Sequence, residues 1–211
     1  AHYAPHTILN GRPDLVEKYL AKHPPVPAPE TRKKCYLCQD AGLSEEGCPG
    51  HHWAQDFNPH LAAMLESIDD GIGLLSSKLE ELGIADDTIL LFTSDNGGES
   101  NVTTNGHLRG GKSELHEGGI RVPFVVRWPA AIPAGTTSDL PTNTLDLLPT
   151  FLAAAGIDAP DSPLDGESVL DEWGAPGGMT ERSPMFWHYP LEKPHFLGGI
   201  SADAILDGDW K

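Results

Sequence analysis

The pattern that most constrains the fold lies between residues 59 and 93, where a long amphipathic segment precedes a short loop and an apolar run. In the amphipathic part, seven leucines and isoleucines recur at alternating spacings of four and three, which places them on one helical face. They are Leu61, Leu65, Ile68, Ile72, Leu75, Leu79 and Leu82. Asn58 fits the N-cap, Pro59 the first helical position, and Gly83 the left-handed conformation that ends a helix. We therefore predict a helix over residues 59–82.

The apolar run at residues 89–93 predicts a strand covered on both faces. A helix, a short loop and a buried strand form the unit of an α/β sheet, in which ligands bind beyond the carboxyl ends of the strands. The sequence TSDNGGES ends this strand and places Asp95 and Asn96 at that position. Their oxygens suit a hard cation such as Ca²⁺ or Mg²⁺. The alternative is an Asn-Gly turn that binds nothing.

Further elements are expected on both sides of this unit. Two other helices are predicted, at residues 13–22 and 144–155. Strands are predicted at residues 121–128, 184–189 and 202–206. After the last of these, an Asp-Gly turn leads to a returning strand of only three residues. We therefore expect the chain to be an internal part of a longer protein that is cut at both ends.

The charge balance excludes some classes of partner. The 211 residues carry a formal net charge of −17, which disfavours general attraction to nucleic acid or to an anionic membrane surface. No apolar run approaches the ~20 residues of a membrane-spanning helix. Residues 101–128 differ from the rest, since their four basic and two acidic side chains give a local charge of +2. An anionic ligand would be expected there.

The same region contains the segment NGHLRGGKSELHEGGIRVPFVVRWP. Its two glycine pairs let the backbone approach a ligand or another segment closely, and His107, Arg109 and Lys112 supply cationic donors for a tetrahedral oxyanion. In the alternative interpretation, the glycines serve tight loops and the arginines pair with Glu114 or Glu117. Composition by itself favours neither interpretation.

Five segments, in this order, resemble the formylglycine-dependent sulfatases of the alkaline-phosphatase superfamily. They are SIDDGIG, ILLFTSDNGG, LRGGKSELHEGGIRVPFVVRWP, DLLPTFLAAAG and DGDWK. The resemblance covers nearly the whole chain outside residues 30–57. It implies a partial three-layer α/β/α alkaline-phosphatase-like sheet over residues 1–185, followed by the start of a small antiparallel C-terminal subdomain over residues 186–211.

The resemblance also assigns site residues. It implies that Asp95 and Asn96 ligate a divalent cation, usually Ca²⁺, with Mg²⁺ as the other candidate. The lysine of the GGK segment contacts the sulfate in this family, which assigns that role to Lys112. A histidine in a YAxHTP-like segment does the same, and YAPHTIL places His6 there, although Ile8 stands where the family usually has proline.

The expected ligand is a sulfated small molecule or carbohydrate. His107 and Arg109 are interpreted as substrate-recognition residues, since they are not general ligands in the family. The segment FWHYP, at residues 186–190, could line a sugar-binding cleft, with His188 as its member for substrate contact. The alternative for this segment is an ordinary strand with its aromatic side chains in the core.

The family nucleophile is absent from these residues. The resemblance implies an upstream Cys-x-Pro-x-Arg or Ser-x-Pro-x-Arg motif, whose first residue becomes the formylglycine that attacks the sulfate ester, and no such motif occurs here. We therefore expect a missing N-terminal part of the same protein, an inactive chain without it, and a periplasmic, secreted or lysosomal parent enzyme. The alternatives are a phosphate or phosphonate ester hydrolase of the same superfamily, or a non-catalytic zinc-stabilised binding module.

All three cysteines lie in the segment 30–57, in the sequence CYLCQDAGLSEEGCPGHH. Cys35, Cys38, Cys48 and His51 have spacings that could hold Zn²⁺. The alternatives are one disulfide with a free thiol, or three inert thiols.

Overall fold

The computed structural model describes residues 4–6, 8–22, 58–179, 181–195 and 197–208. The candidate zinc ligands Cys35, Cys38, Cys48 and His51 lie outside the described residues, as does the rest of the segment 30–57. The chain divides into two compact units. Unit 1 consists of residues 1–81, 94–122 and 190–201, and unit 2 of residues 82–93, 123–189 and 202–211.

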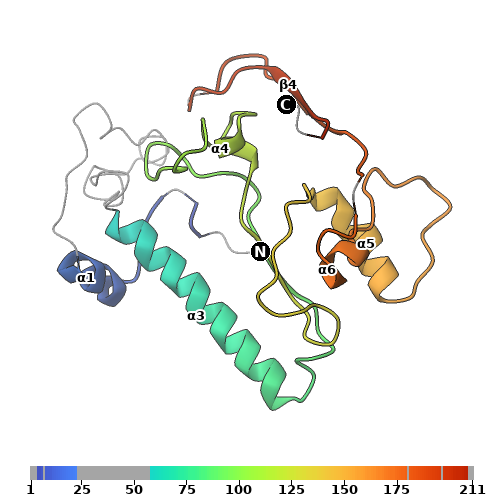
Figure 1. The fold of residues 1–211 in the computed structure, drawn as a ribbon. Helices are drawn as coiled ribbons and strands as arrows, with labels where there is room; N and C mark the ends of the chain where they lie inside the picture. The colour runs from blue at the N-terminus through green and yellow to red at the C-terminus, as the bar shows by residue number, and fades with distance from the viewer. Residues whose placement is uncertain (1–3, 7, 23–57, 180, 196, 209–211) are drawn as a thin grey trace. The chain divides into compact units, whose positions relative to one another are not determined.

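Unit 1 is built on two helices that lie side by side, α1 (Pro13–Lys22) and α3 (Pro59–Glu81) (Figure 1). Leu15 and Val16 of α1 pack against the fully buried Ala63 of α3. The sequence prediction of both helices is confirmed. The Asn58 side chain accepts a hydrogen bond from the Leu61 amide at 3.1 Å, as the predicted N-cap requires.

A second apolar cluster in unit 1 joins three segments that are far apart in the sequence. Leu9, Met64 of α3 and Val102 are buried together, and Ala4 packs against them. Burying apolar surface in this way stabilises the contact by about 25 cal/mol per Å². The cluster therefore fixes both the N-terminal segment and the loop around Val102 to the first half of α3.

The predicted apolar face of α3 is covered only in part. Ile68 is buried, but farther along the predicted face Leu75 and Leu82 are 48% and 57% exposed. The cause is the difference in helix length. The ten residues of α1 span ~15 Å, whereas the 23 residues of α3 span ~35 Å. The second half of α3 therefore has no helix beside it within the described part of unit 1.

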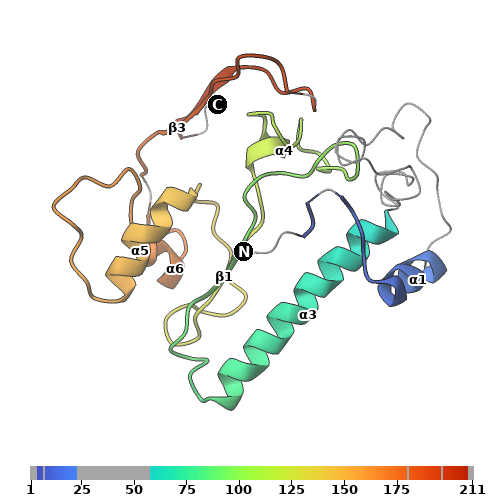
Figure 2. The same ribbon diagram turned by 180° about the vertical axis from the view of Figure 1, so that it is seen from behind.

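Unit 2 contains two antiparallel strand pairs, shown from behind in Figure 2. The strand β1 (Leu90–Thr93) pairs with β2 (Phe124–Arg127). Both strands are predicted from the sequence, but the expectation that the first is covered on both faces is wrong, because Phe92 is 38% exposed. Each of these two strands has one partner among the described residues, and a two-stranded ladder cannot shield its own faces.

The second pair joins β3 (Met185–Tyr189) to β4 (Ala202–Leu206). Both strands agree with the sequence prediction. We expected β4 to pair with a returning strand after Gly208, whereas its partner in the structure is β3. Gly208 has the positive φ of 56° that a tight turn requires, and residues 209–211 are outside the described part of the chain.

The helical part of unit 2 consists of a 3₁₀ turn (η5, Thr144–Asp146), α5 (Leu147–Ala154) and α6 (Leu170–Gly174). The predicted helix at 144–155 is confirmed, although its first turn is 3₁₀, and α6 was not predicted. The two α-helices lie side by side (Figure 2). The Trp173 ring lies 6.3 Å from the ring of Phe151 and 6.3 Å from that of Phe124.

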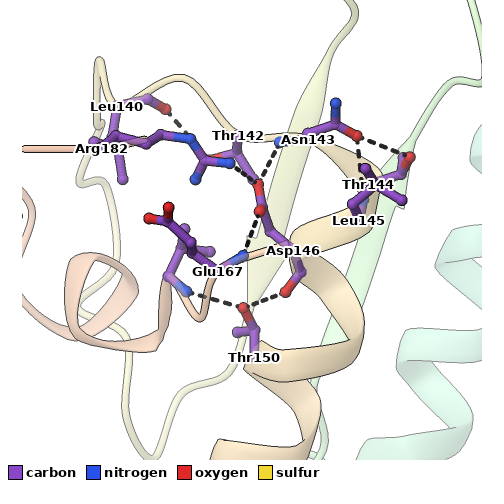
Figure 3. Close-up of polar contacts among 10 residues, drawn as sticks. Leu140, Thr142, Asn143, Thr144, Leu145, Asp146, Thr150, Glu167 and Arg182 are labelled. Carbon is purple, nitrogen blue, oxygen red and sulfur yellow. Dashed lines mark hydrogen bonds and ion pairs between the residues drawn. The ribbon is translucent and has the colours of Figure 1, made fainter. Parts of the chain in front are cut away.

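A buried charged network holds the start of these helices (Figure 3). Asp146 is fully buried, and its carboxylate accepts hydrogen bonds from the Asn143 amide at 2.6 Å and the Glu167 amide at 2.9 Å. The Arg182 guanidinium donates to the same carboxylate at 2.6 Å, and its side chain is only 10% exposed. Asp146 therefore connects three segments of unit 2.

A second acidic residue of unit 2 is bound in the same manner. Glu172 in α6 is 3% exposed, and its carboxylate accepts hydrogen bonds from the Ser138 hydroxyl and from the Gly177 and Met179 amides. The hydrogen bond from Ser138, followed by those from the two amides, lowers the pKa of Glu172 below its ordinary value.

Candidate functional site

The candidate cation ligands lie at the start of the loop that follows β1. Asp95 is exposed and Asn96 is half-buried. The side-chain nitrogen of Asn96 donates to the Gly97 carbonyl at 2.9 Å, and the Ser94 hydroxyl donates to the backbone carbonyl of Asn96 at 2.9 Å. Because the Asn96 side chain uses its nitrogen inside the loop, its oxygen is left as the atom for a ligand. The donor chemistry of this pair, a carboxylate and an amide oxygen, fits a hard cation.

The glycine after this pair is needed for close packing. The Gly97 amide donates to the Gly119 carbonyl at 2.8 Å, and a Cβ on Gly97 would overlap the carbonyl of Gly118. Gly118 and Gly119 lie in the short helix α4 (Glu117–Ile120), which was not predicted. The glycines of the DNGG and EGG sequences therefore allow two backbone segments to touch.

The candidate sulfate-binding lysine lies next to the same loop. The Lys112 amide donates to the Gly98 carbonyl at 3.0 Å, two residues after Asn96. Gly110 has a φ of +77°, which a residue with a side chain rarely adopts, and the Gly111 amide donates to the Glu114 carboxylate at 2.9 Å. The structure thus brings together the backbone segments that carry Asp95, Asn96 and Lys112.

One side chain connects these two segments directly. Asn105 accepts a hydrogen bond from the Gly98 amide at 2.9 Å and donates to the carbonyls of Gly98 and Gly110, both at 3.0 Å. Sequence reasoning missed this residue, because an Asn-Gly dipeptide such as Asn105-Gly106 is indistinguishable from an ordinary turn.

His6 is exposed, in a segment that the apolar cluster of unit 1 holds in place. Ala4 and Leu9, on either side of it, belong to the apolar cluster that also contains Val102. This cluster anchors the His6 segment and the loop that leads to Asn105 to the same part of α3. The direct contact of His6 with a sulfate stays a prediction.

His107 and Arg109 are both exposed in the loop between Asn105 and Gly110. Arg109 forms no ion pair with a described residue, whereas Arg121 pairs with Glu117 at 3.5 Å. The alternative interpretation, in which the arginines pair with nearby glutamates, therefore holds for Arg121. The exposed Arg109 is left available to a ligand.

His188 lies in unit 2, on β3, and is exposed. Its Nδ1 atom lies 2.5 Å from the Asp203 carboxylate, which is directly opposite on β4. The interpretation of this strand as a carrier of core aromatics is wrong for Phe186, which is 71% exposed, while Trp187 and Tyr189 are half-buried. The role of His188 in substrate contact stays a prediction.

Within unit 1, the segment before β4 contacts the loop that carries Lys112. Sequence reasoning missed this contact as well. A Cβ on the buried Gly199 would overlap the carbonyl of Ser113, the residue after Lys112. Ser113 has a positive φ of 76°, which is uncommon for a residue other than glycine. Its hydroxyl is buried and has no hydrogen-bond partner among the described residues.

The structure does not assemble a complete cation site from the described residues. In that part of the chain, no group of three or more His, Cys, Asp or Glu side chains could hold a metal ion. Asp95 and Asn96 supply two oxygen donors, whereas Ca²⁺ takes six to eight. These two residues are therefore one side of a coordination sphere. No helix in the described ranges is long and apolar enough to cross a membrane.

Comparison with known proteins establishes the family. The family model described as Sulfatase matches residues 2–157. The chain belongs to the sulfatase family. Human arylsulfatase A is 41% identical over 162 residues, which cover 68% of this chain and 32% of that protein. Human steryl-sulfatase is 40% identical over 116 residues, which cover 50% of this chain and 20% of that protein. The chain spans about a fifth to a third of the length of these sulfatases.

Solved structures show the same relationship. The crystal structure of Ps i-CgsB with k-i-k-neocarrahexaose matches 97% of this chain and 38% of its own, with a TM-score of 0.69 and 27% identity. BT4656, in complex with its substrate D-glucosamine-2-N,6-O-disulfate, matches 82% of this chain and 33% of its own, with a TM-score of 0.61 and 27% identity. The chain therefore has part of the α/β fold of the sulfatases, as predicted from its sequence.

Proposed function

We propose that this sulfatase-family chain supplies the cation-binding and lysine-bearing side of the active site of a sulfuric ester hydrolase. One observation carries the proposal. The Lys112 amide donates a hydrogen bond to the Gly98 carbonyl. The candidate sulfate-binding lysine and the Asp95-Asn96 pair therefore lie on adjoining backbone segments. Among the described residues, Asp95, Lys112 and Arg109 form no ion pair that would engage their charges elsewhere.

In this proposal, Asp95 and Asn96 hold Ca²⁺, for which Mg²⁺ could substitute, and Lys112 and His6 contact the sulfate. The cation would supply a fixed positive charge opposite the sulfuryl oxygens. The Lys112 ammonium group would add a second positive charge beside the sulfuryl oxygens and would donate hydrogen bonds to them. Charges held in place before the reaction stabilise the transition state because little reorganisation is needed.

The nucleophile comes from outside these residues, since the sequence lacks a Cys-x-Pro-x-Arg or Ser-x-Pro-x-Arg motif. A formylglycine would supply that nucleophile in the parent enzyme. We assign residues 1–185 to the catalytic domain and residues 186–211 to the start of its C-terminal subdomain. The chain without its nucleophile-bearing partner segment is expected to be inactive.

The proposed substrate is a sulfated carbohydrate. A relative from Sus scrofa that is 37% identical over 130 residues is named N-acetylgalactosamine-6-sulfatase, and BT4656 was solved with a disulfated glucosamine. His107 and Arg109 provide exposed donors for hydroxyl or sulfate groups, and His188 is a further candidate. A carbohydrate-directed sulfatase of this kind would act in the periplasm, outside the cell or in lysosomes.

A second candidate activity is supported by one structural neighbour. The phosphonate monoester hydrolase of Agrobacterium radiobacter matches 65% of this chain and 26% of its own, with a TM-score of 0.54 and 27% identity. Phosphonate and sulfate monoesters both present tetrahedral anionic oxygens to a cation and a lysine. Comparing kcat/KM for an aryl sulfate and an aryl phosphonate in the parent enzyme would decide between them.

The proposal is tested by titrating the purified parent enzyme, which contains this chain together with the rest of the active site, with Ca²⁺ and with inorganic sulfate, using calorimetry. Asp95→Ala is expected to abolish or strongly weaken Ca²⁺ binding, because it removes the only carboxylate of the pair. Lys112→Ala is expected to leave Ca²⁺ binding intact and to weaken sulfate binding by about 10- to 100-fold, the value of a charged hydrogen bond.

The matched controls are Asp87→Ala and Lys22→Ala, which remove an exposed carboxylate and an exposed ammonium group outside the site. Both are expected to bind Ca²⁺ and sulfate like the unmodified protein. The proposal would be wrong if Asp95→Ala bound Ca²⁺ with unchanged affinity, or if Lys112→Ala and Lys22→Ala had the same effect on sulfate.

A further inference from the structure

Asn105 makes three hydrogen bonds that cross between the two ligand-bearing segments. Its side-chain oxygen accepts from the Gly98 amide at 2.9 Å, and its side-chain nitrogen donates to the Gly98 and Gly110 carbonyls at 3.0 Å. Gly98 is two residues after Asn96, and Gly110 is two residues before Lys112. A single carboxamide therefore connects the segment that carries the candidate cation ligands to the segment that carries the candidate sulfate-binding lysine.

The space around this carboxamide is closely filled. A Cβ on Gly98 would lie 2.9 Å from the Asn105 side-chain oxygen, and a Cβ on Gly111 would lie 3.1 Å from its nitrogen. Real Cβ atoms rarely approach other atoms so closely, so both neighbours have to be glycine. The two segments consequently have little freedom to slide past the amide, and their separation depends on its dimensions.

The loop that carries Asn105 is itself fixed to the core of unit 1. Its loop contains Val102, which is 4% exposed in the apolar cluster with Leu9 and Met64. The Asn105 carbonyl accepts a hydrogen bond from the Leu108 amide at 3.0 Å, which begins the turn that presents His107 and Arg109. The amide therefore connects the two segments from a fixed position on the core of unit 1.

We infer that Asn105 is a positioning residue, which sets the distance between the cation at Asp95 and Asn96 and the ammonium group of Lys112. This inference rests on the proposed function of these three residues. An anion can contact the cation and the ammonium group together only when their separation matches its size. Asn105 thereby couples the binding of Ca²⁺ to the binding of sulfate, although it contacts neither ligand.

The experiment measures this coupling in the purified parent enzyme, with Ca²⁺ and inorganic sulfate as the probes. In the unmodified protein, saturating Ca²⁺ is expected to tighten sulfate binding by a factor within the usual range of about 5 to 150. Asn105→Ala is expected to reduce the factor to about 1. Sulfate affinity without Ca²⁺ should stay within about twofold, because Lys112 itself is unchanged.

Two further variants separate positioning from general damage. Asn105→Ser retains a hydroxyl that can make one of the three hydrogen bonds, so this variant should keep an intermediate coupling factor. If Asn105→Ala does not fold, Asn105→Ser takes its place in the experiment. Asn101→Ala changes another asparagine of the same loop and should keep the full factor. Hydrogen exchange gives a readout without ligand, since the Gly98 and Lys112 amides should lose protection in Asn105→Ala but not in Asn101→Ala.

The outcomes distinguish the inference from the proposed function. If Asp95→Ala loses Ca²⁺ and Lys112→Ala loses sulfate but the unmodified protein shows no coupling, the positioning role is overturned and the proposed function stands. If those two variants keep their affinities for Ca²⁺ and for sulfate, respectively, the proposed function is wrong and the positioning role falls with it. If the unmodified protein and Asn105→Ala show the same coupling factor, the inference about Asn105 is wrong and the proposed function stands. A loss of coupling in Asn105→Ala together with exposed Gly98 and Lys112 amides supports both.

Discussion

The ligand-bearing loops of unit 1 and the helical part of unit 2 use their charged residues in opposite ways. In residues 95–119, the segments are joined by backbone hydrogen bonds, by closely packed glycines and by the neutral side chain of Asn105, while Asp95 and Arg109 are exposed. In unit 2, segments that are far apart in the sequence are joined by the buried carboxylates of Asp146 and Glu172.

This difference separates structural charges from charges that are available to a ligand. A buried carboxylate must be fully hydrogen-bonded, so Asp146 and Glu172 cannot serve a ligand without loss of stability. Where neutral groups hold the backbone, the charged side chains are free to bind. We therefore expect substitutions of charge to affect stability in the helical part of unit 2 and binding in the ligand-bearing loops of unit 1.

The largest expected effect is that of Asp146→Asn. The substitution removes the negative charge from a buried pair and leaves the Arg182 guanidinium, which is 10% exposed, without its counter-ion. Removing one partner of a buried ion pair costs about 3–5 kcal/mol of unfolding free energy. Urea denaturation monitored by circular dichroism measures the loss.

The control for this prediction is Lys78→Ala, which breaks the exposed pair between Lys78 and Glu81 on α3. An exposed ion pair contributes about 0–1 kcal/mol, so the control should change the unfolding free energy by no more than that. Equal effects of the two variants would contradict the distinction between buried structural charges and exposed ones.

A smaller, pH-dependent effect is expected at Glu172. Hydrogen bonds from Ser138, Gly177 and Met179 hold its pKa below the ordinary value of 4.5 in the folded state. Its contribution to stability is therefore complete above about pH 4.5 and is lost as the pH falls below this value through the lower folded-state pKa. Glu172→Gln should be less stable than the unmodified protein near neutral pH, and the difference should shrink in acid.

Thermal unfolding midpoints measured across this pH range test the prediction. Glu181→Gln removes an exposed acidic group outside the Glu172 hydrogen-bond network and should follow the profile of the unmodified protein. A difference between Glu172→Gln and the unmodified protein that stayed constant from neutral pH into acid would show that the carboxylate charge is not what stabilises α6.

The smallest change in stability is expected for Asp95→Asn. The side chain is exposed and the loop is held by neutral groups, so without divalent cations the unfolding free energy should change by less than about 0.5 kcal/mol. Adding Ca²⁺ should stabilise the unmodified parent enzyme but not its Asp95→Asn variant, because a ligand that binds only the folded state stabilises it. A large loss of stability in EDTA would place Asp95 among the structural charges.

Local sequence signals predicted most of the regular structure. The helix at residues 13–22 and the strand at residues 202–206 have the predicted bounds, and the long helix ends one residue before its predicted end. These elements depend on periodicity, proline and glycine, which act within a few residues. The short helices α4 and α6 were missed, since five residues or fewer carry too little periodic pattern.

Predictions that depend on burial were less successful. The second half of the α3 face and some side chains of β1 and β2 are apolar, as core residues are, yet they are exposed. A periodic apolar pattern specifies which face of an element is apolar but not what covers that face. The same limit applies to the site. The motifs predicted Asp95, Asn96 and Lys112 as ligands, but Asn105 could not be distinguished from a turn residue until its hydrogen-bond partners were seen.

The sequence by itself determined the order of helices and strands, the sulfatase resemblance and the residue types suited to a hard cation and an oxyanion. These properties reside in residue identity and short-range spacing. Only the tertiary structure decided that the Asp95-Asn96 loop adjoins the Lys112 loop, and that Asp146 and Glu172 are structural. Such pairings join residues as many as 36 positions apart, as Asp146 and Arg182 are, and depend on which backbone segments come within hydrogen-bonding distance when the chain packs.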